Sequence, residues 1–175
     1  KVSEEGFAGL FYEVNTLAPV IQNLVIDGAF VEATGFNSYA GVVITSHEYR
    51  GGGFNNITVR NATVKATKYA GVIAAYTGGG IGADFIDCTV EDSILDVQEM
   101  PEGTGVDKPH VGGIVGLMNV GTFSGNTVTD LTITVHPADG YSEVQSERIG
   151  SLIGTAQSGV FPKDPDFASE NTISG

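Results

Sequence analysis

The sequence predicts an all-β fold, a right-handed parallel β-helix (β-solenoid) of about five degenerate repeats of 30–42 residues. Three observations predict it. A short apolar segment with a small central residue recurs five times, a second segment with alternating polarity follows it four times in the same order, and Val, Ile, Thr and Gly are abundant throughout. β-Branched residues favour strands, and glycine and asparagine favour the turns between them. We therefore expect one domain spanning residues 1–175.

The first recurring segment is five residues long and occupies residues 7–11, 39–43, 69–73, 111–115 and 149–153. Its third residue is small in every copy, and the copies are spaced by 32, 30, 42 and 38 residues. Segments that recur in the same order at uneven distances are typical of repeat proteins. In these proteins each repeat is one supersecondary unit, and insertions between units form loops. We align the copies at their third residues, which are Gly9, Gly41, Gly71, Gly113 and Ser151.

The second segment begins at residues 23, 56, 87 and 125 and alternates between apolar and polar residues, as a half-buried strand does. Its sixth residue is Gly, Asn or Asp, types that tolerate a left-handed conformation, so a corner is expected there. Beyond the corner the alternation resumes with changed parity. The predicted interior consists of Leu24, Ile26, Ile57, Val59, Cys88, Val90, Val128, Val31, Val64, Leu95 and Ile133.

Two outward columns carry charge if repeats stack about 4.8 Å apart, the spacing of neighbouring strands. The first column contains Asp27, Arg60 and Glu91, and the second contains Glu32, Lys65 and Asp96. Each column places one cation between two anions, an order that favours pairing between neighbouring strands. The columns support the register, and they are also what a solvated face would show.

Polar insertions at residues 98–109, 137–147 and 161–167 lengthen the later repeats and predict surface loops. The chain enters directly on a repeat near Phe7 and stops at Gly175, where another strand segment would begin. We therefore expect a fragment of a larger protein, with further repeats or flanking domains of the same polypeptide.

Composition excludes several classes of function. The chain has 8 basic and 21 acidic residues, a net charge of −13, which disfavours nucleic acids and anionic lipid surfaces. No apolar run is long enough to span a bilayer, so no membrane insertion is expected. Cys88 is the single cysteine, which rules out an intrachain disulfide and a cysteine-based zinc site.

The segment from Val111 to Gly116, with the block Asp87-Cys88-Thr89-Val90, resembles the GLUG-type repeats of bacterial surface proteins. In that family a Gly-Gly-apolar-Val-Gly strand leads to an Asn-Cys-polar-Val strand, and Asp87 stands here in place of the Asn. The resemblance covers nearly the whole chain. It implies a secreted or cell-surface location, often in gut bacteria, adhesin-like parent proteins and no shared catalytic residues.

Few residues suggest chemistry. Asp84, Asp87 and Asp92 are weak candidates for a calcium site, because calcium takes several carboxylate oxygens, although no calcium-loop spacing is present. His47 and His110, like His136, lie far apart in the sequence without metal-ligand or triad spacing, so we expect surface or loop positions for them. No catalytic residue and no cofactor is predicted.

Glycine triplets at residues 51–53 and 78–80 lack the Gly-Lys-Ser/Thr of a phosphate-binding loop. They fall between the two recurring segments in adjacent repeats, which predicts turns that stack on each other.

Two functions follow as expectations. The first is a non-catalytic structural or adhesive module, extracellular or on the bacterial cell surface, with a host or dietary glycan or an extracellular protein as partner. The alternative is a carbohydrate-active enzyme, a lyase-like or hydrolase-like β-helix, which needs carboxylates gathered on neighbouring repeats. Acidic residues that converge in one groove would favour the enzyme, and acidic residues spread along outer columns would favour the binding module.

Overall fold

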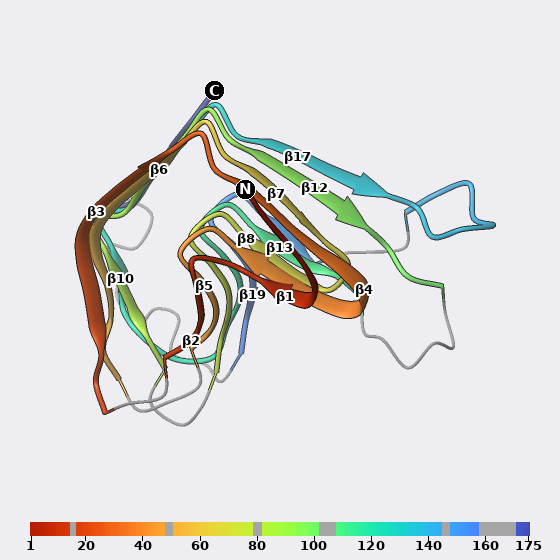
Figure 1. The fold of residues 1–175 in the computed structure, drawn as a ribbon. Coiled ribbons are helices and arrows are strands. Elements are labelled where there is room, and N and C mark those ends of the chain that lie inside the picture. Colours follow the sequence, from red (N-terminus) through yellow and green to blue (C-terminus); the bar gives the residue numbers. More distant parts are fainter. Residues whose placement is uncertain (15–16, 48–50, 79–81, 102–107, 145–147, 158–170) are drawn as a thin grey trace.

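The computed structural model describes residues 1–14, 17–47, 51–78, 82–101, 108–144, 148–157 and 171–175. Within this part of the chain the regular elements are all β-strands, and each strand pairing is parallel. Figure 1 shows three sheets that curl around a shared interior. The prediction of an all-β fold is confirmed, and the parallel pairing predicted for it is confirmed as well.

Sheet A, which carries the candidate site described below, contains eight strands. A path of seven runs in the order β17-β12-β7-β4-β8-β13-β18, and β1 pairs with β4 outside it. The strands are β1 (Val2–Ala8), β4 (Phe30–Gly41), β7 (Thr63–Ala66), β8 (Tyr69–Gly71), β12 (Ile94–Gln98), β13 (His110–Gly112), β17 (Thr132–His136) and β18 (Ile149–Gly150).

Sheets B and C complete the fold. Sheet B has the order β19-β14-β9-β5-β2, with strands β2 (Phe11–Glu13), β5 (Ile44–His47), β9 (Ala74–Thr77), β14 (Val115–Met118) and β19 (Ile153–Ala156). Sheet C consists of β3 (Val20–Asp27), β6 (Gly53–Arg60), β10 (Asp84–Ile86), β11 (Thr89–Glu91), β15 (Phe123–Ser124), β16 (Thr127–Thr129) and β20 (Thr172–Ser174).

Equivalent residues of successive repeats are direct neighbours across the strands. In sheet C, Val59 pairs with Ile26 on one side and with Val90 on the other. Val90 pairs in turn with Val128, and Val128 pairs with Ile173. The same stepwise pairing joins Val31, Val64, Leu95 and Ile133 in sheet A. The sequence repeat is therefore also a structural repeat.

The predicted corner residues adopt the left-handed conformation. Gly28, Asn61, Asp92 and Asp130 have φ angles of 70°, 53°, 46° and 49°. A second left-handed column, which was not predicted, lies at the first residue of the same segment, in Asn23, Asn56, Asp87 and Gly125. The corner column lies where the chain passes from sheet C to sheet A, and the second column lies between neighbouring stretches of sheet C. These bends explain why Asn and Asp, which tolerate this conformation better than other residues do, recur at both positions.

The predicted interior columns are confirmed. Eight of those side chains are at most 3% exposed, and Leu24, Ile26 and Ile133 are partly buried against the same core cluster. The changed parity beyond the corner is also correct, because Ala62, Val64 and Ala66 are all buried. Each buried aliphatic side chain contributes about 1.5–3 kcal/mol, so this continuous core is the main stabilising feature.

One alignment of the recurring segment was wrong by one residue. Gly71 pairs with Gly112, rather than with Gly113, and Tyr69 pairs with His110. The physical reason is a tight bend, at which a Cβ on Gly71 would lie 2.1 Å from the Ala74 carbonyl oxygen and one on Gly112 would lie 2.1 Å from that of Val115. The fifth segment keeps its place relative to the fourth, since Gly112 pairs with Gly150.

The described residues of the two glycine triplets do not pair with each other as predicted. The Gly51 amide donates to the Gly82 carbonyl oxygen, and Gly53 pairs with Asp84. Gly78 instead donates its amide to the His47 carbonyl oxygen, several residues before the first triplet. Residues 79 and 80 lie outside the described residues, as does the predicted loop at 161–167.

Two asparagines replace apolar residues in the interior of the last repeats. The amide nitrogen of Asn126 donates to the Phe85 carbonyl oxygen at 2.9 Å, and its amide oxygen accepts from the Cys88 backbone N–H at 3.0 Å. Asn171 accepts from the Asn126 backbone N–H at 3.0 Å and donates to the Phe123 carbonyl oxygen at 3.2 Å. Buried polar groups are stable only when they are hydrogen-bonded, and here the bonds join three successive repeats.

Candidate functional site: a polar groove on sheet A

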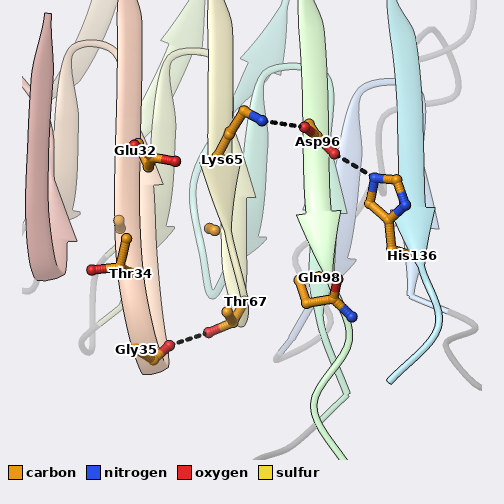
Figure 2. A pocket seen from close by; sticks show the side chains of 10 residues that line it. Glu32, Thr34, Gly35, Lys65, Thr67, Asp96, Gln98 and His136 are labelled. Carbon is orange, nitrogen blue, oxygen red and sulfur yellow. Dashed lines mark hydrogen bonds and ion pairs between the residues drawn. The ribbon is translucent and has the colours of Figure 1, made fainter. Parts of the chain in front are cut away.

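A groove of about 460 Å³ crosses the outer face of sheet A. Figure 2 shows its side chains on four adjacent strands, β4, β7, β12 and β17. Because residues two apart on a strand point to the same face, the groove presents two parallel columns. Its lining is Glu32, Ala33, Thr34, Gly35, Lys65, Ala66, Thr67, Asp96, Gln98 and His136.

The charged column is the second one that the sequence predicted. Lys65 pairs in register with Glu32 on one side and with Asp96 on the other, so the predicted order is confirmed. The Lys65 ammonium lies 2.6 Å from one carboxylate oxygen of Asp96. His136 approaches the other carboxylate oxygen through Nε2, also at 2.6 Å (Figure 2).

These contacts shift the acid–base equilibria in opposite directions. The hydrogen bond from Lys65 lowers the pKa of Asp96 below its ordinary value, and His136 lowers it further, against a smaller opposing effect of burial. Asp96 in turn raises the pKa of Lys65, mainly through the same hydrogen bond. Asp96 is therefore ionised near neutral pH and acts as an acceptor between two donors, rather than as a source of protons.

The second column of the groove is neutral and polar. It contains Thr34, Thr67 and Gln98, followed by His136, which pairs in register with Gln98. Thr67 donates its hydroxyl to the Gly35 carbonyl oxygen at 2.9 Å, and Gln98 donates its amide to the Pro137 carbonyl oxygen at 2.7 Å. The sequence interpretation missed this column, although the alternation that predicted Asp96 extends two residues further to Gln98.

The other predicted charged column lies on sheet C. Arg60 pairs in register with Asp27 and with Glu91, which confirms the order. The Arg60 guanidinium donates to Asp27 at 2.9 Å, and both side chains are about half exposed. Hydrogen bonds from Asn61 and then from Arg60 lower the pKa of Asp27. This column links repeats at the surface, where solvent screening keeps the contribution of such pairs to stability small.

The calcium candidates have structural roles in turns. One Asp84 carboxylate oxygen accepts the Thr122 backbone N–H at 2.7 Å, while Asp87 and Asp92 occupy left-handed bends with φ angles of 52° and 46°. Among the residues that the structure describes, no group of three or more His, Cys, Asp or Glu side chains is arranged to hold a metal ion.

The expectation of surface positions for the histidines was wrong for two of the three. His47 is 1% exposed and His110 is 2% exposed, whereas His136 is exposed. Burial lowers the pKa of His47, and neither ring nitrogen has a hydrogen-bond partner within the described part of the chain. The signal for His110 was its position in the repeat, where Tyr39 and Tyr69 form an aromatic column with it.

The His110 ring also joins the last two repeats. Its Nε2 accepts from the Arg148 guanidinium at 2.7 Å, because guanidinium groups only donate. Nδ1 then carries the proton and donates to the Thr155 hydroxyl at 2.8 Å. This arrangement fixes a neutral imidazole in a structural position.

No family model, curated protein or solved structure matches this chain. None of the described residues form a helix long and apolar enough to cross a membrane. The groove on sheet A is therefore assessed from its own chemistry, which offers paired charges beside neutral hydrogen-bonding groups.

Proposed function

We propose that the chain is a right-handed parallel β-solenoid that serves as a non-catalytic structural or adhesive module, extracellular or on the bacterial cell surface. The parallel, in-register pairing of every repeat supports the solenoid architecture. Resemblance to GLUG-type repeats supports the location. The partner is a glycan or an extracellular protein, and flanking domains of the same polypeptide carry the module.

The distribution of acidic side chains is the observation that carries the non-catalytic proposal. Asp27 is held by Arg60 on sheet C, and Asp96 is held by Lys65 on sheet A. Both carboxylates therefore link neighbouring repeats. A glycosidase needs two carboxyl groups facing one bond, one of them with a raised pKa, whereas hydrogen bonds lower the pKa of both Asp27 and Asp96.

The alternative is a carbohydrate-active enzyme centred on the groove of sheet A. Glu32, Asp96 and His136 give it acid–base side chains within one lining. Asp96 and His136 lie 2.6 Å apart, close enough for proton transfer between them. For the enzyme alternative to hold, Asp96 must give up its ion pair with Lys65 and contact the substrate instead.

The test combines turnover and binding on the same sample. Purified chain is incubated with plant and host glycans while released reducing ends and unsaturated products are measured, and it is then applied to arrays of glycans and extracellular-matrix proteins. We expect binding without product. Clear turnover that is lost in Asp96→Asn would refute the non-catalytic module and establish the alternative.

A further inference from the structure

We propose that the groove on sheet A binds a neutral saccharide, with its rings laid across β4, β7, β12 and β17. This inference rests on the proposed binding function and names the ligand class and the residues that contact it. It follows from three properties of the groove: its charge balance, its unused hydrogen-bonding groups and its size.

The charges of the groove are largely paired within the protein. Lys65 and His136 both contact Asp96, and Glu32 adjoins Lys65 in register. A strongly cationic or anionic ligand would have to break these contacts. The net charge of −13 also disfavours anionic polymers such as uronate or sulfated chains. A neutral ligand meets neither obstacle.

Hydrogen-bonding groups with capacity left for a ligand lie along the neutral column. The exposed Thr34 hydroxyl has no hydrogen-bond partner among the described residues, and Gln98 uses its amide nitrogen while its Oε1 has none in the same part of the chain. The Lys65 ammonium has three N–H donors, of which one points to Asp96. Mixed donors and acceptors spaced by about 4.8 Å, the distance between strands, suit the hydroxyls of successive sugar rings.

The size of the groove also suits such rings. Ala33, Gly35 and Ala66 complete its lining, although the side chains of Ala33 and Ala66 belong to the buried core. The groove of about 460 Å³ lies within the range of about 300–1,000 Å³ that small-molecule sites occupy. Figure 2 shows Thr34, Thr67 and Gln98 on the same side as the charged column, so one ligand could contact both columns.

The experiment titrates the full chain with neutral hexasaccharides of glucose, xylose and mannose, and with hexagalacturonate as the anionic counterpart, by isothermal calorimetry at low and high salt. At least one neutral hexasaccharide is expected to bind, with little salt dependence. Thr34→Val and Gln98→Leu should each weaken it about three- to tenfold, the loss of one hydrogen bond. Thr58→Val, on the outer face of sheet C, is the matched control and should bind as the unaltered chain does.

Binding of hexagalacturonate alone, absence of any saccharide binding, or neutral binding that Thr34→Val and Gln98→Leu leave unchanged would each overturn the proposal. Thermal unfolding of Thr34→Val and Gln98→Leu shows whether a weaker affinity comes from a lost contact with the saccharide or from a loss of folding. If a folded variant binds the saccharide with full affinity, the substituted residue is not part of the binding site. Protein binding on the arrays without saccharide binding would leave the adhesive module standing. Product release would refute the non-catalytic module.

Discussion

Lys65 and Asp96 occupy the same position in successive repeats, and their charged groups lie 2.6 Å apart. Their backbones are paired in register, so the ion pair reports directly on the stacking of β7 against β12. A shift of one residue would turn one of the two side chains toward the core, because neighbouring residues on a strand face opposite ways. The pair thus contributes to the choice of register as well as to stability.

Charge reversal at this pair tests its contribution. Lys65→Asp places three acidic residues in one column, and we expect it to lower the free energy of unfolding by about 0.5–1 kcal/mol. The double variant Lys65→Asp/Asp96→Lys should recover most of that loss. Urea unfolding of the single and double variants measures the coupling, and additive losses would show that the two side chains do not interact.

Acid should weaken the same contact. Lys65 lowers the pKa of Asp96 below its ordinary value of 3.8, so the folded state binds this proton less readily than the unfolded state does. The contribution of ionised Asp96 to the free energy of unfolding is complete above pH 3.8 and declines as the pH falls below that value. Asp96→Asn should reduce this part of the acid dependence, as followed by urea unfolding at several pH values.

Adjacent residues in β6 separate the inner face from the outer face. Val59 is fully buried in the core, whereas Thr58 points outward in a partly exposed column. Val59→Asp should prevent folding, because an unpaired buried carboxylate costs more than about 4 kcal/mol. Thr58→Asp should leave a cooperative thermal transition. Circular dichroism compares the two variants, and equal tolerance would contradict the assigned faces.

The buried Asn126 should be more sensitive to truncation than a partly exposed asparagine. Asn126→Ala leaves the Cys88 N–H and the Phe85 carbonyl without their side-chain partners, at a cost of about 1–3 kcal/mol for each unsatisfied group. Asn55→Ala, in β6, serves as the control and should cost less than about 1 kcal/mol. Chemical unfolding measures both variants. A small loss for Asn126→Ala would mean that water replaces the amide.

His47 should make stability depend on pH below neutrality. Burial lowers its pKa from the ordinary value of 6.5, so the unfolded state binds the proton first. Stability is therefore fully present above pH 6.5 and falls as the pH decreases toward the folded-state pKa. Met118 lies two repeats further along the same column, after Thr77, so His47→Met should fit.

The His47→Met variant should be at least as stable as the parent chain and should lose the dependence of stability on pH below 6.5. Thermal unfolding across this range measures it. An unchanged pH profile in the variant would assign the dependence to another group.

Most of the fold could be predicted because each segment repeats the same two-residue alternation. That period placed Val59, Val90 and Val128 in the interior and Arg60 on the surface. The fourth repeat was misaligned because Gly112 and Gly113 are adjacent, and either one matches the small third residue of the recurring segment. The strand register decides between them, because Gly112 and not Gly113 pairs with Gly71.

The groove was harder to predict than the columns. Its charged side follows from the alternation, but its depth depends on how the side chains of Glu32, Lys65, Asp96 and His136 are arranged across four strands. The alternation of apolar and polar residues along one strand predicts neither the depth of the groove nor the contact between His136 and Asp96. For His136 only a surface or loop position was expected, because the alternation of the fourth repeat was not followed beyond Ile133 to the last residue of β17.

Pairing between whole repeats has a consequence for the order of folding. Val2 pairs with Val31, and Thr127 pairs with Thr172, so among the described strands none finds its partner in a nearby hairpin. Two complete repeats must come together before any ladder forms, and the entropy of closing the intervening loops opposes that first step. Each later repeat then adds its strands to an existing template. We expect slow initiation followed by rapid addition of repeats, which would let repeats emerging from a ribosome or a secretion channel be added one after another.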